Sequence, residues 1–186
     1  MHALHTDRLI LREWRDSDRA PFAAMNSDPR VMGFFPQLLS RRESDALVDR
    51  INEHFVQHGF GLYAAELTAT HVFFGYIGLA VPNFSAPFTP CVEIGWRLLA
   101  NYWDKGLATE GARAVVNYAF HVLGLNSLVS FTVPQNVRSR RVMEKIGLTH
   151  SPAEDFDHPK LPAGHPLCRH LLYRLCKTDV LQNSPT

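Results

Sequence analysis

The chain has 186 residues, of which 46% are hydrophobic and 20% are charged. This length suits one domain with one substantial core, and this composition excludes a mainly disordered chain. The 19 Lys and Arg residues nearly balance the 18 Asp and Glu residues, which argues against a general binder of nucleic acid or membrane surfaces. We therefore expect a single domain over residues 1–186, with its core at about residues 8–176 and a flexible tail at residues 177–186.

The sequence shows no feature of an exported, membrane-spanning or metal-binding protein. No apolar run reaches the roughly 20 residues that span a bilayer, and residues 1–7 contain no apolar signal-peptide segment. The cysteines Cys91, Cys168 and Cys176 lack CxxC spacing. The polar residues near the C-terminus also fit no standard metal-site spacing: Asp155, Asp157, His158, His165, Cys168 and His170. We expect a reduced, cytoplasmic monomer or homodimer that binds no metal, membrane or nucleic acid.

The first elements are predicted from short local signals. Residues 8–13 (RLILRE) predict a strand. Ser17 is a candidate N-cap for a short helix that ends near Met25. Residues 28–36 (DPRVMGFFP) then predict a loop that carries two adjacent aromatic side chains.

A longer helix follows a capping-box pattern. Ser40 and Glu43 can each satisfy a free backbone N–H at a helix start. Apolar residues then recur at helical spacing up to about His58, and Gly59 is a typical helix stop. The sequence therefore predicts a helix over about residues 41–58.

The remaining elements indicate the fold class. Further strands are predicted at residues 62–67, 72–79, 91–98, 128–133 and 170–175. Two more helices are predicted at residues 108–123 and 136–146, and Asn136 is a good N-cap for the second. Strands and helices do not alternate strictly, so a mixed α/β or α+β fold is favoured over a doubly wound sheet.

Residues 91–111 (CVEIGWRLLANYWDKGLATEG) predict a strand, a glycine-bearing turn and a helix start. Backbone N–H groups and the helix dipole favour a phosphate at such a turn. Residues 106–113 (GLATEGAR) lack the Lys-Ser/Thr of a nucleotide-hydrolysing P-loop, and the dinucleotide pattern GxGxxG is absent. A phosphate ligand of another kind and an ordinary strand-to-helix turn both remain open.

Three blocks together resemble the GNAT N-acetyltransferase superfamily, in the branch of the ribosomal-protein serine/alanine acetyltransferases. The first is EIGW at residues 93–96, followed by YWDKGLATEG at residues 102–111. The second is NVRSRRVMEKIG at residues 136–147, and the third is the ending FDHP…HLLYRL at residues 156–175. The blocks occur in the family's order and at its spacing, so the resemblance covers nearly the whole chain.

The resemblance implies a GNAT-like α/β fold with about 6–7 strands, mostly antiparallel, about 4 flanking helices and a splayed strand pair at the cofactor. It also implies acetyl-CoA as the acyl donor. The basic residues of the helix at 136–146 either attract the 3′-phosphate of CoA or form a solvated face. The implied cofactor-binding residues are Leu98, Leu99, Trp103, Asp104, Lys105, Gly106, Leu107, Ala108, Thr109, Asn136, Ser139 and Arg141.

One residue departs from the family pattern. Asp104 stands where the branch usually has glycine. A carboxylate that faced the pyrophosphate would weaken binding by like-charge repulsion. We therefore expect the Asp104 side chain to point away from the cofactor.

The resemblance implies direct transfer of acetyl to an amine. Glu93 is the candidate general base, directly or through a water, and the alternative is a strand carboxylate paired with Arg97 or another cation. Ser139, or more weakly Tyr102, is the candidate donor to the leaving thiolate. A backbone N–H near Leu98 or Leu99 is the candidate oxyanion donor.

The acceptor is expected to be a protein N-terminal α-amine or a small-molecule amine. Phe34 and Phe35 are candidate walls of its pocket, together with Glu93, although paired aromatics before a proline are as often core residues. The competing hypothesis is a non-catalytic acyl-CoA-binding or regulatory protein on the same fold.

Overall fold

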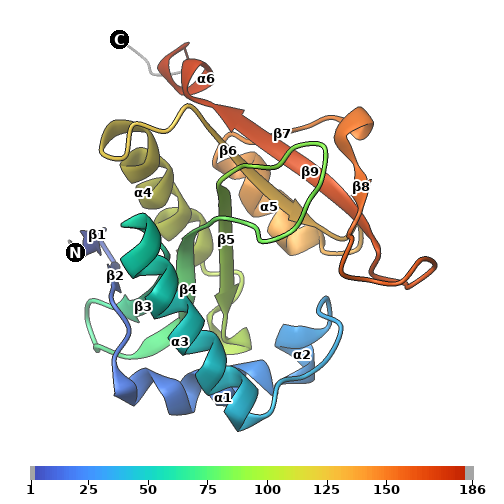
Figure 1. Cartoon of the computed structure of the whole chain (residues 1–186). Coiled ribbons are helices and arrows are strands. Elements are labelled where there is room, and N and C mark those ends of the chain that lie inside the picture. Colours follow the sequence, from blue (N-terminus) through green and yellow to red (C-terminus); the bar gives the residue numbers. More distant parts are fainter. Residues whose placement is uncertain (1–2, 183–186) are drawn as a thin grey trace. The chain divides into compact units, whose positions relative to one another are not determined.

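Nine strands and six α-helices make up the described part of the chain, residues 3–182 of this computed structural model (Figure 1). These residues cluster into two units, one formed by residues 3–80 and 95–115 and the other by residues 81–94 and 116–182. Strand β5 (Glu93–Leu98) and helix α4 (Leu107–His121) each begin in one unit and end in the other. The predicted single domain stays a prediction.

The first unit is built on four antiparallel strands. They are hydrogen-bonded in the order β1 (Leu4–His5), β2 (Leu9–Arg12), β3 (Leu62–Leu67) and β4 (Phe73–Ala80). The predicted strands at residues 8–13, 62–67 and 72–79 are therefore confirmed, and the last two pair as a hairpin.

Strand β4 contains a bulge that brings it close to the end of β5. Its register with β3 shifts so that Phe74 is the extra residue. The Phe74 carbonyl accepts a hydrogen bond from the N–H of Leu99 at 2.9 Å. Beside it, Gly75 has φ +152°, and a Cβ there would lie 2.2 Å from the Arg97 carbonyl oxygen. Only glycine allows this close approach of the two backbones.

Helices cover both faces of β4 within the first unit. Its helices are α1 (Arg19–Asn26), α2 (Pro29–Met32), α3 (Arg41–His58) and the first turns of α4, and α3 crosses β3 and β4 in Figure 1. Tyr76 packs in a core cluster with Phe22 of α1 and Val48 of α3. The next residue, Ile77, faces Gly111 of α4, where an added Cβ would lie 2.5 Å from the Ile77 side chain.

Both ends of α3 are confirmed as predicted. The Glu43 N–H donates to Ser40 Oγ at 3.3 Å, and the Ser40 N–H donates to Glu43 Oε2 at 2.8 Å. These two bonds complete the capping box. At the other end, Gly59 has φ +75° and closes the helix after His58.

Two local predictions in the first unit need correction. Ser17 does not cap a helix, because it lies inside the 3-10 turn Asp16–Asp18 that leads into α1. Residues 28–36 are not entirely loop, since Pro29–Met32 form α2. The Asp28 side chain accepts from the Arg30 N–H at 2.9 Å, and proline at the first helical position favours this start.

The second unit is built around β6 (Ser127–Thr132). This strand pairs antiparallel with β9 (Arg169–Cys176) over six positions and parallel with β5 at Glu93↔Val129. Two short strands also pair with β9: β7 (Thr149–His150) and β8 (Phe156–Asp157). The predicted strands at residues 128–133 and 170–175 are confirmed.

The helices of the second unit follow β6 and β9. Helix α5 (Val137–Lys145) has Asn136 as its N-cap, as predicted, and Gly147 follows it at φ +94°. Residues 177–182, expected as part of a flexible tail, form α6 (Lys177–Gln182). The Cys176 N–H donates to Asp179 Oδ2 at 3.1 Å at its start. Residues 183–186 lie outside the described part.

The predicted fold class is confirmed as a mixed, mostly antiparallel sheet with helices. There are more elements than expected because β1, β7 and β8 have two residues each, and α2 has only four. Segments this short carry no periodic sequence signal. Among residues 3–182, no helix is both long enough and apolar enough to cross a bilayer.

Candidate active site

The turn before α4 has the backbone geometry of an anion site. Asp104 has φ +57° and Gly106 has φ +78°, and the helix begins at Leu107. Most side chains disfavour positive φ, although Asp tolerates it better than most. The conformation of residue 104 therefore gives a physical reason for the glycine usual at this position. The turn leads into a helix N-terminus, which is suited to phosphate groups.

Arg8 holds this turn from the start of β2. Its Nη1 donates to the Lys105 carbonyl at 3.1 Å, and its Nε donates to Glu110 Oε2 at 2.6 Å. Thr6 Oγ1 donates to the other Glu110 oxygen at 2.6 Å. Burial alone would raise the pKa of Glu110, but the hydrogen bonds from Thr6 and Arg8 outweigh it and lower that pKa. Glu110 is therefore an ionised anchor in the first turn of α4.

The residues between β5 and the turn are fixed by packing and backbone bonds. Trp103 Nε1 donates to the Leu98 carbonyl at 2.9 Å. The Tyr102 ring lies 5.3 Å from the Phe74 ring, and Lys105 Nζ lies 5.5 Å from the Tyr102 ring centre. The Leu99 N–H already donates to Phe74. This bond uses the N–H of one of the two expected oxyanion donors, and the oxyanion donor itself stays a prediction.

Glu93 is a carboxyl group in an unusual environment. It begins β5, opposite Val129 of β6. Within residues 3–182 its side chain has no described hydrogen bond or ion pair, and burial raises the pKa of Glu93 to about 8. Part of the residue still reaches the surface. A carboxyl group whose pKa lies near physiological pH can both accept and release a proton there.

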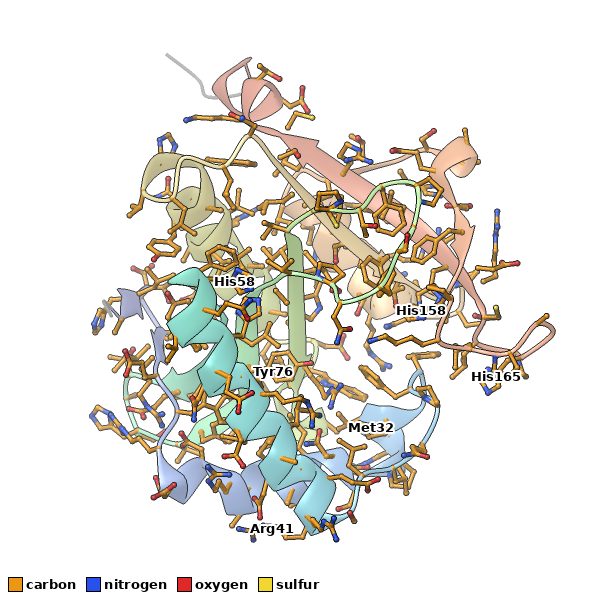
Figure 2. The ribbon with its side chains drawn as sticks, viewed as in Figure 1. Met32, Arg41, His58, Tyr76, His158 and His165 are labelled. Atoms are coloured by element: carbon orange, nitrogen blue, oxygen red, sulfur yellow. The ribbon has the colours of Figure 1, made fainter. Side chains whose placement is uncertain are left out.

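Arg97 is not the partner of Glu93. Its Nη1 donates to Asn26 Oδ1 at 2.6 Å, and its guanidinium lies 3.9 Å from the centre of the Phe35 ring. It also lies 5.5 Å from the ring of Tyr76, which is labelled in Figure 2. The alternative of a Glu93–Arg97 pair is therefore wrong.

The two aromatics expected to line the acceptor pocket follow α2. Phe34 and Phe35 are each 37% exposed, so neither is a core residue. Phe35 lies against Arg97, and its N–H donates to the Met32 carbonyl at 2.9 Å. The pocket itself stays a prediction.

The start of α5 gathers three of the expected cofactor residues. Asn136 Oδ1 accepts from the Ser139 N–H at 3.3 Å, and Asn136 Nδ2 donates to Thr132 Oγ1 at 2.9 Å. Each end of this amide keeps one further hydrogen-bonding position. Arg141 is exposed, whereas Arg140 donates to the Pro134 carbonyl at 3.1 Å. Arg141 is therefore better placed than Arg140 to contact a CoA phosphate.

The second unit also contains an aromatic and histidine cluster that the sequence did not reveal. The His158 and His170 rings lie 5.1 Å apart, beside Phe131 and Phe156 (His158 is labelled in Figure 2). Burial lowers the pKa of both histidines. No group of three or more His, Cys, Asp or Glu among residues 3–182 is placed to hold a metal ion. The cluster therefore consists of neutral, packed rings.

Cys91 borders this cluster and is a poor nucleophile. Burial raises the pKa of its thiol to about 11, and the nearby Glu93 carboxyl acts in the same direction. Almost none of this cysteine is thiolate at neutral pH. A covalent acyl-cysteine at residue 91 is therefore disfavoured.

The expected site residues fall into two groups. The first unit holds Phe34, Phe35, Leu98, Leu99, Tyr102, Trp103, Asp104, Lys105, Gly106, Leu107, Ala108 and Thr109. The second unit holds Glu93, Asn136, Ser139 and Arg141. Sequence reasoning missed Arg8 and the Arg97–Asn26 bond, because each contact joins residues far apart in the chain.

Comparison with known proteins gives a consistent result. Residues 8–149 match the family model described as "Acetyltransferase (GNAT) domain". The chain is 30% identical over 169 residues to the uncharacterized N-acetyltransferase YnaD of Bacillus subtilis (strain 168), an alignment covering 89% of this chain and 91% of YnaD. It is 34% identical over 154 residues to the FsC-acetyl coenzyme A-N(2)-transacetylase of Aspergillus fumigatus, covering 79% of this chain and 65% of that enzyme.

A solved structure shares the fold. The acetyltransferase from Agrobacterium tumefaciens str. C58 superposes with a TM-score of 0.76 and 28% sequence identity, and the match covers 95% of each chain.

Proposed function

The chain belongs to the GNAT acetyltransferase family and is an acetyl-CoA-dependent N-acetyltransferase, and from this premise we propose that its acceptor is a protein N-terminal α-amine or a small-molecule amine. The amine attacks the thioester directly in a ternary complex, and Glu93 takes its proton, directly or through a water. The observation that carries this proposal is the partly buried Glu93 carboxyl, which has no described partner among residues 3–182 and whose pKa burial raises to about 8.

The pKa of Glu93 favours an α-amine over a lysine as acceptor. An α-amine has a pKa of about 7.8, so roughly a seventh is neutral at pH 7. A lysine with a pKa of about 10.4 is neutral about one time in 2,500, which adds about 3.5 kcal/mol to its deprotonation. Proton transfer from an α-ammonium to a carboxylate with a pKa of about 8 is nearly balanced in free energy.

The remaining groups have distinct tasks. The turn at residues 104–107 and Arg141 bind the phosphates of acetyl-CoA, and the Leu98 N–H stabilises the oxyanion. Attack forms the C–N bond, and the C–S bond then breaks. The departing thiolate accepts a hydrogen bond from the hydroxyl of Ser139 or, more weakly, of Tyr102. The proton that the attacking nitrogen still carries then passes to the thiolate, which leaves as the free thiol of CoA. Nothing in this scheme needs Cys91, whose raised pKa keeps it a thiol.

The proposal is tested by supplying labelled acetyl-CoA with a panel of peptides, free amines and lysine side chains. We expect label on peptide α-amines or small amines with stoichiometric release of CoA. Label confined to lysine side chains or polyamines would contradict the α-amine proposal. CoA binding without turnover on any acceptor would contradict direct transfer.

The role of Glu93 is tested by Glu93→Gln, with Glu53→Gln on the exposed face of α3 as the matched control. Loss of a general base lowers rates by about 100-fold or more. We expect such a loss in kcat for Glu93→Gln and none for Glu53→Gln. A Glu93→Gln enzyme with near-normal kcat would remove Glu93 from the mechanism.

A further inference from the structure

Arg97 is a half-buried cation that has no counter-ion among residues 3–182. Its described hydrogen bond is to a neutral amide, from Nη1 to Asn26 Oδ1 at 2.6 Å. No described carboxylate forms an ion pair with it within residues 3–182. Other arginines of the first unit differ, because Arg12 contacts Asp18 at 2.7 Å and Arg19 contacts Asp49 at 2.6 Å.

The donors of Arg97 are not fully used. Nε is buried and makes no hydrogen bond. Nη2 also has no described partner. Unlike Nε, it is not buried, so it can reach a ligand at the surface. Partial burial of a guanidinium whose N–H donors are unused is unfavourable in free energy, and an anionic ligand would offset this.

The surroundings of Arg97 hold its guanidinium in a fixed plane. The Phe35 ring lies 3.9 Å away on one side, and Tyr76 lies at 5.5 Å. Asn26 is itself fixed, since its Nδ2 donates to Ser44 Oγ at 2.9 Å and both residues are fully buried. A guanidinium positioned in this way needs little further ordering to bind a planar anion.

We propose that Arg97 is a specificity-determining residue that binds a carboxylate on the acceptor. The favoured acceptors are then amines that carry a carboxylate, with Phe34 and Phe35 offering apolar contact beside it. A carboxylate fits better than a phosphate dianion because one guanidinium supplies one charge and a planar fork. This inference rests on the proposed acetylation of amines, and it adds a charge requirement to the acceptor.

The kinetic test uses acceptor pairs that differ only in charge. Tripeptide amides with Asp or Asn, or Glu or Gln, at each of the first three positions are compared by kcat/KM. We expect the native enzyme to prefer at least one carboxylate-bearing peptide over its amide by about 10- to 100-fold. Arg97→Gln should abolish that preference, and Arg97→Lys should retain only part of it. Arg42→Gln, at an exposed position of α3, is the control.

A purely structural role for Arg97 predicts a different pattern. If Arg97 only supports Phe35, Arg97→Gln lowers kcat/KM equally for both members of each pair. Equal losses of this kind, or no charge preference in the native enzyme, would overturn the proposal.

Binding provides a readout that does not depend on turnover. The N-acetylated forms of the same peptides are titrated into the CoA-loaded protein by calorimetry. Tighter binding of a carboxylate-bearing peptide, lost in Arg97→Gln, supports the inference even if no peptide is acetylated, and the proposed function alone then fails. Acetylation of neutral amines with no charge preference in rate or binding overturns this inference and leaves the proposed function intact.

Discussion

The guanidinium of Arg8 donates from Nη1 to the carbonyl of Lys105 at 3.1 Å, which ties the start of β2 to the turn before α4. The same side chain contacts Glu110 at 2.6 Å on the first turn of that helix. The conformation of the turn therefore depends on a residue outside the motif that forms it. We expect both contacts to help order the backbone N–H groups that are proposed to bind the phosphates.

Replacing Arg8 should weaken acetyl-CoA binding more than catalysis. In Arg8→Ala the turn loses a hydrogen bond at Lys105 and Glu110 loses its cation. Because Arg8 is 51% exposed, we expect only about a 3- to 10-fold rise in KM for acetyl-CoA, with kcat little changed. Initial rates at varied acetyl-CoA provide the measurement, and Arg42→Ala is the control. A fall in kcat with unchanged KM would speak against a role in cofactor binding.

Removing the charge of Asp104 should strengthen cofactor binding. This carboxylate lies in the proposed pyrophosphate turn at φ +57°. Asp104→Asn keeps a residue that tolerates positive φ, so it isolates the charge, whereas Asp104→Gly also removes about 1 kcal/mol of backbone strain. We expect a lower Kd for CoA in both variants and a raised Tm in Asp104→Gly alone. Weaker CoA binding in Asp104→Asn would show that the carboxylate helps the site.

Sequence reasoning succeeded where partners are close in the chain. The caps formed by Ser40 with Glu43 and by Asn136 with Ser139 each join residues three apart, so a local pattern predicts them. The strand, turn and helix start within residues 91–111 were predicted for the same reason.

Contacts between distant residues could not be found in this way. The Arg8–Lys105 bond spans 97 positions and the Arg97–Asn26 bond spans 71. No periodicity encodes which of many arginines meets which acceptor. The isolation of Glu93 likewise depends on how surrounding elements exclude water, and the strand pattern gave only the face on which it lies.

The pH dependence of the reaction should report Glu93. Because burial raises its pKa to about 8, most of the carboxyl is protonated at pH 7 and cannot act as a base. We expect kcat/KM to rise about tenfold per pH unit below pH 8 if Glu93 alone limits the rate, and to level off above it. The profile of kcat/KM against pH should be measured with an acceptor amine of low pKa, so that ionisation of the acceptor does not contribute to it. In Glu93→Gln the rise of kcat/KM below pH 8 should disappear. If the rise persists, it reports the ionisation of another group.

The same pKa predicts how stability depends on pH. The folded-state pKa of Glu93 lies above its unfolded value, so folding favours the protonated form. The contribution of Glu93 to stability is therefore largest at low pH and falls as pH rises from about 4.5 to about 8. Glu93→Gln should lose this slope and unfold at higher denaturant than the native protein at pH 8. If the unfolding free energies of the two proteins depended on pH in the same way, the raised pKa of Glu93 would be contradicted.

Asn136 should separate helix capping from cofactor binding. Asn136→Ala removes both the acceptor for the Ser139 N–H and the donor to Thr132, and we expect a loss of about 1–2 kcal/mol in unfolding free energy. Asn136→Asp keeps a capping acceptor, so its stability should lie closer to that of the native protein. The added charge and lost N–H donor should still raise KM for acetyl-CoA.

Urea unfolding and acetyl-CoA kinetics on the two Asn136 variants provide the measurements. Ser139→Ala is the control for the unfolding measurement alone, because it keeps the backbone N–H that Asn136 caps and removes only the hydroxyl. If Asn136→Asp has native stability together with native KM, the amide acts solely as a cap. If its KM rises while stability is retained, the amide contacts the cofactor, because capping alone cannot produce that separation.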